Sequence, residues 1–373
     1  MLLLAQTVGL AILIGRLWPG RSRRPPTVPL LEEVLDTTVS VVVTTLNEAS
    51  RIAPCLAGLR AQRRPLLEIL VVDSRSTDGT RQLVEAAARL DPRIRLLTDE
   101  PLPEGWVGKV WALEHGLRAA RGEWVLGVDA DTEPMPGMVA GAIAGAREAG
   151  YSVVSFSPKF AAQSAGEQFI QAALLLTLVY RGGTVGCDRD AEHVLANGQC
   201  FLARRDALLR HGGYRSARAS FADDVTLARH LARRGERVGF LDGSRLYLVR
   251  SYRSMGEMWR EWGRSLDLKD ATSTPRRWLD ILYLIAVQGL PLIVLTALGI
   301  VAQTSPLTPA ARMLGLVNGA LFGIHVLLLW PLSPSYERPG AAFWLSPLAD
   351  PLAVARIVVS TLQRRRTWRG RSY

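Results

Sequence analysis

The sequence predicts an α/β domain built on a doubly wound, mostly parallel sheet, flanked by apolar segments that meet a membrane. Strand-like and helix-like segments alternate from residue 37 to about residue 100, as in parallel sheets that carry helices on both faces. Charge-free runs lie near both ends of the chain. The composition, 48% hydrophobic and 21% charged with a mean hydropathy of +0.13, lies between those of a soluble enzyme and a polytopic channel.

Residues 1–18 are expected to form an uncleaved membrane anchor. Met1 to Gly15 carry no charge, and as a helix they measure only about 22 Å, so Arg16 to Trp18 would serve as interface anchors. Basic residues follow this apolar run rather than precede it, unlike the order in a cleavable signal peptide. The next domain is therefore expected in the cytoplasm, after a linker over residues 19–36.

Residues 37–275 are long enough for one large domain. Its first part predicts strands over 39–46, 68–73, 93–99 and 123–131, with helices over 49–61 and 80–90. The strands are continuous apolar runs rich in β-branched residues, as expected for strands buried on both faces. Ligands of such sheets bind at the carboxyl ends of the strands.

Carboxylates stand at those strand ends. Asp73 ends the second strand, and Asp129 and Asp131 end the fourth. Alternation along an extended chain would put Asp129 and Asp131 on one side, where they can jointly meet Mg²⁺ or Mn²⁺ or a metal diphosphate. An isolated Asp-x-Asp also occurs in solvated turns, but the end of a buried strand favours the ligand site.

A second acidic pair, Asp223 and Asp224, opens an expected helix over 225–234. Acidic residues at a helix N-terminus can simply favour the helix dipole. One of them can instead be a general base that takes a proton from an attacking hydroxyl. Composition alone does not choose between these interpretations.

The C-terminal third predicts further membrane contact. Residues 279–332 are expected to form two transmembrane helices, the first kinked near Pro291, joined by the short outer loop 304–311. Residues 341–373 are interpreted as a helix in the cytoplasmic interface followed by a basic tail that meets anionic headgroups. A fourth span over 341–362 is the alternative.

Together these motifs resemble the family 2 glycosyltransferases of the GT-A fold, whose Rossmann-like nucleotide-sugar domain carries a D-x-D motif and a later acidic pair. The stretch 104–113, with its G-W-x-G-K-x-x-A pattern, resembles membrane enzymes that glycosylate hydrophobic lipids, including the ceramide and hopanoid-associated branches. Segments 197–208, 220–235, 261–272 and 367–373 look most like bacterial carotenoid glycosyltransferases. Those of the cyanobacterial type glycosylate the 2′-hydroxyl of a monocyclic xanthophyll.

The resemblance implies roles for individual residues. It assigns nucleotide-sugar contacts to Thr45, Asn47, Glu48, Asp73, Lys109 and Asp129, with Lys109 at the diphosphate. It assigns the metal to Asp131 and Asp129, the base to Asp224 beside Asp223, and acceptor or diphosphate contacts to Trp262 and Arg264. Processive synthases carry Q-x-x-R-W near the membrane, which this chain lacks, so polymer extension is not expected.

The implied activity is an inverting, Mg²⁺- or Mn²⁺-dependent transfer of a hexose or deoxyhexose from a UDP- or GDP-sugar to a membrane-dissolved carotenoid. The enzyme would be a multi-pass protein of the cell membrane with its catalytic domain facing the cytoplasm. Two alternatives stay open: another lipid acceptor (hopanoid, ceramide, diacylglycerol or polyprenyl phosphate), or an inactive, membrane-tethered nucleotide-sugar-binding module. The net charge of +11 lies largely beside apolar spans, so a membrane and not a nucleic acid is the expected partner.

Overall fold

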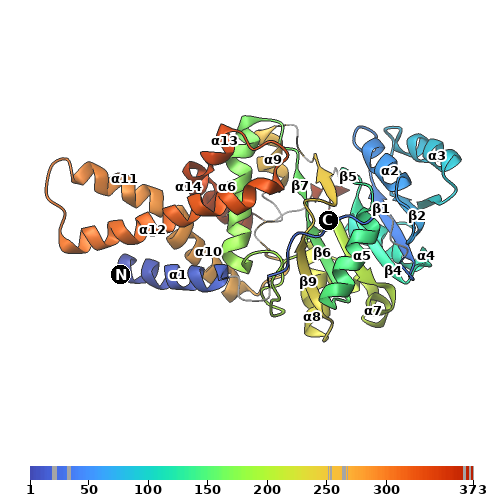
Figure 1. Cartoon of the computed structure of the whole chain (residues 1–373), viewed down its shortest axis with the longest axis horizontal. Coiled ribbons are helices and arrows are strands. Elements are labelled where there is room, and N and C mark those ends of the chain that lie inside the picture. The colour runs from blue at the N-terminus through green and yellow to red at the C-terminus, as the bar shows by residue number, and fades with distance from the viewer. Residues whose placement is uncertain are drawn as a thin grey trace. The chain divides into compact units, whose positions relative to one another are not determined.

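The computed structural model describes residues 1–18, 23–31, 35–250, 252, 254–262, 266, 268–363, 367–368 and 371–372. Its contacts divide the chain into two units, each assembled from separate stretches (Figure 1). The α/β unit comprises residues 22–160, 185–251 and 365–373, and the helical unit comprises residues 1–21, 161–184 and 252–364. The predicted catalytic domain, 37–275, is therefore interrupted by residues 161–184, and its last residues, 252–275, belong to the helical unit.

The α/β unit begins with the predicted alternation. Its elements are β1 (Val39–Thr45), α2 (Ile52–Arg60), β2 (Leu66–Asp73), α3 (Thr80–Leu90), β3 (Ile94–Thr98), α4 (Gly108–Ala119), β4 (Trp124–Asp129), β5 (Thr132–Pro134), α5 (Met138–Ala149), β6 (Val153–Ser157), β7 (Lys159–Phe160), β8 (Cys200–Arg204), α7 (Arg205–Arg210), η1 (Gly213–Ala217), α8 (Asp223–Arg233), β9 (Val238–Asp242), β10 (Tyr247–Val249), β11 (Thr367–Trp368) and β12 (Arg371–Ser372).

The main sheet runs in the order β3-β2-β1-β4-β8-β6-β9. The strands β1 to β4 pair in parallel, as predicted. β8 lies antiparallel between β4 and β6, so the sheet is mixed rather than parallel. The chain leaves this unit for residues 161–184 after β7, and on its return β8 enters the sheet in the opposite direction. A smaller sheet joins β5, β10 and β7.

Alternating side chains of β1 explain its continuous apolar sequence. Val41 and Val43 pack in the core that includes residues of α2 and α5, whereas Val42 packs with residues of α4. All three valines are buried, because successive side chains of a strand point to opposite faces. Helices on both faces thus leave the carboxyl ends of β1, β2 and β4 as the edge where polar residues gather.

Part of the predicted linker is instead packed on the α/β unit. Within residues 23–31, the Leu30 amide donates to the Gly137 carbonyl over 3.1 Å. On α5, a Cβ added at Gly141 would lie 2.4 Å from the Val28 carbonyl oxygen. Glycines on one side of α5 therefore make room for this strand-like segment, and the described part of the linker is fixed along the domain.

The helical unit contains α1 (Leu2–Leu17), α6 (Ala165–Gly182), α9 (Met255–Glu261), α10 (Thr274–Leu284), η3, a π-helix (Ile285–Gly289), α11 (Pro291–Val301), α12 (Pro309–Leu332), η4 (Ser333–Ser335), α13 (Ala341–Trp344), η5 (Ser346–Ala349) and α14 (Asp350–Leu362). Its apolar core joins α1, α6, α12 and α14, with Leu13, Leu174, Leu321 and Ile357 all buried. This packing is why α6 leaves the predicted catalytic domain.

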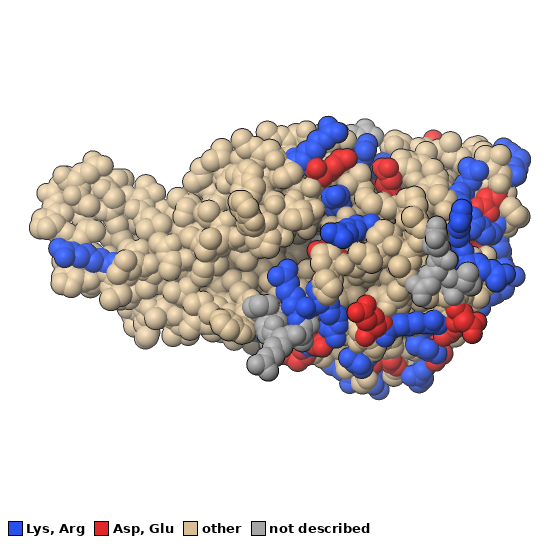
Figure 2. Space-filling view, in the orientation of Figure 1, with Lys and Arg blue, Asp and Glu red and all other residues tan. Residues whose placement is uncertain are grey.

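The predicted transmembrane hairpin corresponds to a bent helix pair followed by a long helix. Residues Thr274–Gly289 and Pro291–Val301 meet at 43°, at the predicted kink. Within the described residues, Pro309–Ser335 is long and apolar enough to span a membrane, as is the bent pair if it counts as one span. Arg312 is the only charged residue between 281 and 332, and Figure 2 shows the α11–α12 region almost free of charge on the visible face.

The stretch 341–362 is not one continuous helix. It is broken into α13, η5 and α14, with Pro347 and Pro351 at the starts of the latter two. The 13 residues of α14 measure about 20 Å, short of a bilayer core. The broken geometry thus disfavours a fourth span. The predicted tail arginines at 364–366 and 369 lie outside the described residues.

Buried polar groups link the helices of this unit. Gln6 of α1 and Asn318 of α12 exchange amide hydrogen bonds of 2.7 and 2.8 Å. Asp350 accepts from Gln288 over 2.7 Å and lies 2.6 Å from His325 Nδ1. Because unsatisfied polar groups are costly in an apolar interior, these pairs select one arrangement of the helices.

Candidate active site

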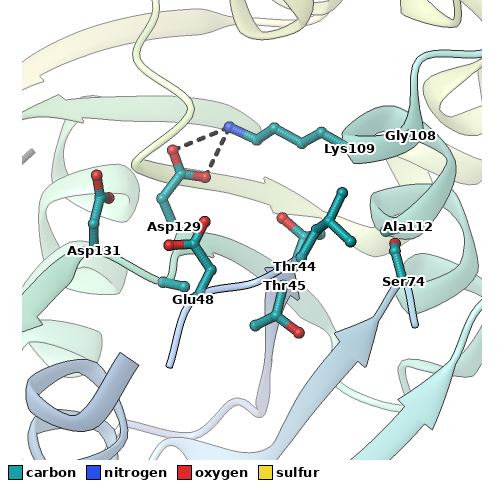
Figure 3. Close-up of a pocket in the computed structure, with 11 residues that line it drawn as sticks. Thr44, Thr45, Glu48, Ser74, Gly108, Lys109, Ala112, Asp129 and Asp131 are labelled. Atoms are coloured by element: carbon teal, nitrogen blue, oxygen red, sulfur yellow. Dashed lines mark hydrogen bonds and ion pairs between the residues drawn. The ribbon is translucent and has the colours of Figure 1, made fainter. Parts of the chain in front are cut away.

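A pocket opens at the carboxyl ends of β1 and β4, beside the start of α4 (Figure 3). It is lined by Thr44, Thr45, Leu46, Glu48, Ser74, Gly108, Lys109, Ala112, Asp129, Ala130 and Asp131. The site lies where a doubly wound sheet is expected to bind ligands. It brings together five of the predicted residues: Thr45, Glu48, Lys109, Asp129 and Asp131.

Lys109 forms an ion pair with Asp129. Its Nζ lies 2.7 and 3.0 Å from the two carboxylate oxygens, and both side chains are largely shielded from solvent (Figure 3). Burial by itself lowers the pKa of Lys109, but the negative charges of Asp129, Asp223 and Asp224 more than offset this effect and raise it. Lys109 therefore stays positively charged among three carboxylates.

Asp131 follows Asp129 in a turn, not in the extended chain that the sequence suggested. β4 ends at Asp129 and β5 starts at Thr132. The Thr132 hydroxyl donates to the Asp129 carbonyl over 2.8 Å, which closes the turn. Cys55 lies beneath it, 3.7 Å from the same carbonyl, where burial raises the pKa of its thiol to about 12. The turn still brings both carboxylates to the pocket.

The second acidic pair starts α8, as predicted, and lies close to Lys109. Asp224 accepts a hydrogen bond from the Gly198 amide over 2.7 Å and another from the Val225 amide over 2.8 Å. Burial raises the pKa of both Asp223 and Asp224, and the positive charge of Lys109 opposes the shift. A carboxylate with a raised pKa beside a polar pocket suits proton abstraction.

Asp73 and Asn47 hold the loops around the pocket together. Asp73 is fully buried and accepts hydrogen bonds from Thr45, Ser76 and Arg81. Asn47 has a left-handed backbone with φ of 58°, and its side-chain oxygen accepts from the Thr77 amide over 2.9 Å. Asp73 and Asn47 therefore support the loops next to the pocket, whereas Thr45 and Glu48 line the pocket itself.

Trp262 and Arg264, the two residues predicted near the acceptor or diphosphate, stay predictions. Trp262 belongs to the helical unit, where its ring lies 6.5 Å from that of Tyr252. Arg264 lies outside the described residues.

Thr44, Ser74 and Gly198 are site residues that the sequence did not single out. Thr44 and Ser74 line the pocket, and each lies one position from a predicted residue. Their place at the ends of predicted strands could therefore have indicated them. Gly198 precedes β8 within a segment quoted only for its family resemblance. Its role depends on the distant residues Lys109 and Asp224, which no local pattern connects to it.

The carboxylates of the pocket suit a hard divalent cation such as Mg²⁺. Asp129 and Asp131 supply carboxylate oxygens to one pocket, and Mg²⁺ is commonly held by one or two carboxylates together with substrate phosphates. Within the described residues, no group of three or more His, Cys, Asp or Glu side chains is arranged to bind a metal alone. These carboxylates would therefore hold a cation jointly with phosphate oxygens or water.

Comparison with known proteins agrees with this geometry. Residues 40–211, which run from β1 to the end of α7, match the sequence profile described as glycosyl transferase family 2. These residues form a family 2 glycosyltransferase domain. The matched stretch contains the whole pocket lining, while Asp223 and Asp224 follow it.

Two curated proteins illustrate the family 2 similarity. The succinoglycan biosynthesis protein ExoO of Rhizobium meliloti is 35% identical over 108 residues, 29% of each protein. The dolichyl-phosphate beta-glucosyltransferase ALG5C of Trichomonas vaginalis is 39% identical over 114 residues, 28% of this chain and 32% of that protein. This chain thus matches only about a third or less of the length of these relatives.

The fold similarity extends beyond the family 2 domain. The mannosyltransferase PcManGT of Pyrobaculum calidifontis, solved with GDP-Man and Mn²⁺, superposes with a TM-score of 0.56 at 22% identity. The superposition covers 98% of this chain and 100% of that one. The likeness extends the shared fold to segments outside residues 40–211, including those of the helical unit.

Proposed function

We propose that this protein is an inverting, metal-dependent glycosyltransferase that moves a hexose or deoxyhexose from a UDP- or GDP-sugar to a hydroxyl of a membrane-dissolved lipid. The acceptor that we propose first is a carotenoid. The observation that carries the proposal is the convergence of Lys109, Asp129 and Asp131 of the family 2 domain with Asp224, which follows that domain in the chain. This set supplies a cationic contact, two metal-type ligands and a base.

The donor would bind with its diphosphate at Lys109 and the D-x-D carboxylates. Thr45 and Glu48 line the same pocket and would contact the nucleoside. When bound, a divalent cation on Asp131 and Asp129 would neutralise charge on the departing diphosphate. The structural neighbour solved with GDP-Man and Mn²⁺ supports this donor chemistry.

The transfer step needs a base on the acceptor side. Asp224 takes the proton of the acceptor hydroxyl. At the same time the hydroxyl oxygen bonds to the anomeric carbon of the sugar, and the bond from that carbon to the diphosphate breaks. Two backbone amides hold the Asp224 carboxylate in place, which fixes its direction without removing its charge. General-base catalysis contributes roughly 10² to 10⁴ in rate, and a single displacement inverts the anomeric centre.

A membrane-dissolved acceptor accounts for the apolar helices. The α11 and α12 helices expose Ile293, Leu316 and Leu327, and large exposed apolar surfaces mark membrane or protein interaction sites. We assign this surface to the bilayer of the cell membrane, with the catalytic domain in the cytoplasm. The match to a dolichyl-phosphate glucosyltransferase favours polyprenyl phosphate as the second candidate acceptor.

The test uses membranes that contain the full chain, with Asp224→Asn as control. They are incubated with Mn²⁺, a panel of UDP- and GDP-sugars, and either a hydroxylated monocyclic carotenoid or a polyprenyl phosphate, and lipid extracts are analysed by mass spectrometry. A carotenoid glycoside formed only by the wild type supports the proposal. Glycosylation of polyprenyl phosphate alone replaces the acceptor, and absence of any wild-type transfer refutes glycosyltransferase activity.

A further inference from the structure

The turn that carries Asp131 is closed by a side chain outside the pocket lining. Asp129 is paired with Thr44 of β1, so the sheet fixes its backbone. Asp131 lies beyond the end of β4, beside Asp129 (Figure 3), and the turn between β4 and β5 sets the position of its carboxylate. The Thr132 hydroxyl donates to the Asp129 carbonyl across this turn, over 2.8 Å. Thr132 is 1% exposed, so the bond is shielded from water.

The helix α2 packs against the same turn. The Cys55 sulfur lies 3.7 Å from the Asp129 carbonyl oxygen and 3.7 Å from the Thr132 hydroxyl oxygen. Gly58 follows Cys55 by three residues, which puts both on one side of the helix. A Cβ added at Gly58 would lie 2.4 Å from the Pro134 carbonyl oxygen, so β5 runs directly against the helix backbone. α2 therefore holds both the turn and the strand that follows it.

A divalent cation makes strict demands on the position of Asp131. Mg²⁺ requires near-ideal octahedral geometry, with its oxygen ligands at roughly 2.0–2.1 Å. Groups that orient metal ligands without touching the metal typically contribute roughly 10- to 100-fold to its affinity. The bond from Thr132 orients the peptide that follows Asp129 and leads to Asp131. Loss of this bond would let that peptide rotate and move the Asp131 carboxylate.

We propose that Thr132, supported by Cys55, is a positioning residue that sets Asp131 for the divalent cation of the donor complex. The inference rests on the metal-dependent function proposed above and adds to it the group that fixes the metal ligand. Thr132 does not line the pocket, so its effect passes through Asp131. It should control how tightly the cation binds, and not the rate of transfer once the cation is bound.

The main test measures Mn²⁺ binding directly. The purified full chain is titrated with Mn²⁺ in the presence of UDP or GDP, and free Mn²⁺ is followed by its electron paramagnetic resonance signal. Thr132→Val removes the hydroxyl and keeps the shape of the side chain, whereas Thr132→Ser keeps the hydroxyl. Thr177→Val in α6 is the matched control, because the buried Thr177 hydroxyl also donates to a carbonyl, that of Leu174, over 2.7 Å.

For Thr132→Val we expect the Mn²⁺ Kd to rise at least about tenfold. At saturating Mn²⁺, kcat for transfer to a total membrane lipid extract should return to within about twofold of wild type. Thr132→Ser and Thr177→Val should keep the Mn²⁺ Kd of wild type. A merely structural role would lower the melting temperature and kcat of Thr132→Val and leave its Mn²⁺ Kd unchanged, and that result overturns the proposal. An equal rise of the Kd in Thr132→Ser overturns it as well.

Cys55→Ala decides the matter if Thr132→Val does not fold. This variant keeps the Thr132 hydroxyl and removes the sulfur that lies against the turn. We expect its Mn²⁺ Kd to rise at least about threefold, and an unchanged Kd then overturns the proposal. A wild type that binds Mn²⁺ with a nucleotide but transfers no sugar refutes the transferase function, while the Kd values still decide the role of Thr132. A wild type that binds no Mn²⁺ refutes the metal site and the positioning role together.

Discussion

Replacing Asp73 by asparagine separates two roles for this carboxylate, a contact to the bound nucleoside and a buttress of the pocket wall. Asp73 Oδ1 accepts from Thr45 Oγ1 over 3.0 Å and from Ser76 Oγ over 2.5 Å. Its Oδ2 accepts from the Ser76 amide over 3.0 Å and from Arg81 over 3.1 Å. With both oxygens engaged and no exposed surface, the structure favours the buttress.

The expected loss of stability follows from these hydrogen bonds. In asparagine the amide nitrogen can replace Oδ1, since the Thr45 and Ser76 hydroxyls can turn to accept. The three hydrogen bonds from the Thr45 hydroxyl, the Ser76 hydroxyl and the Ser76 amide then lose their charge-assisted strength, at about 1 kcal/mol each, or about 3 kcal/mol in all. The Arg81 pair is left out because the side chain of Arg81 is 34% exposed and its charge is screened. For a unit of roughly 200 residues, this loss lowers Tm by about 6–12 °C.

The assay compares thermal unfolding and nucleotide-sugar binding of the purified full chain with and without Asp73→Asn. A lower Tm with donor affinity partly retained fits the buttress. A wild-type Tm with donor binding abolished would refute it and return Asp73 to direct contact with the nucleoside. If neither quantity changes, the hydrogen-bond energies assigned to Asp73 are wrong.

Three further outcomes are expected. Because the base acts deprotonated and burial raises the pKa of Asp224, kcat should begin to fall with decreasing pH above the usual range of an aspartate. Lys109→Met removes a positive charge that lowers this pKa and should move the fall in kcat to higher pH; a pH profile unchanged by Lys109→Met would contradict the coupling of the two groups. Treatment with EDTA should abolish transfer, and Mn²⁺ or Mg²⁺ should restore it; full activity in EDTA rejects a metal at Asp131. His325→Leu leaves Asp350 buried without its histidine partner and should cost about 3–5 kcal/mol, seen as a lower Tm in detergent, whereas an unchanged Tm argues against this contribution.

The first half of the fold could be predicted because its sequence is locally consistent. The runs 39–46 and 68–73 are apolar and end in polar residues, and both become buried parallel strands. β8 was missed because its sequence, Cys200–Arg204, is short and ends in arginine. Its antiparallel direction also depends on the chain leaving the sheet after β7, which no local pattern reveals.

The site was predictable to the extent that residues stand at strand ends. Asp129 and Asp131 reach the pocket because β4 delivers them there. Asp73 stands at an equivalent strand end, but neighbouring hydroxyl, amide and guanidinium groups surround its carboxylate. Strand position predicts which edge of the sheet a side chain reaches, whereas tertiary hydrogen bonds decide whether that side chain faces the ligand or the loops.

The ion pair between Lys109 and Asp129 suggests how the pocket can accept a diphosphate, the role that the family resemblance implies for Lys109. A partly buried carboxylate loses some of its hydration, and the ammonium 2.7 Å from Asp129 offsets that loss. A cation that binds Asp129 with the donor diphosphate would take over the neutralisation of Asp129, and the released ammonium would gain the diphosphate as its partner. Donor binding then exchanges ion pairs without leaving a buried charge alone, so Lys109 can contact the carboxylate in one state and the phosphate in the other.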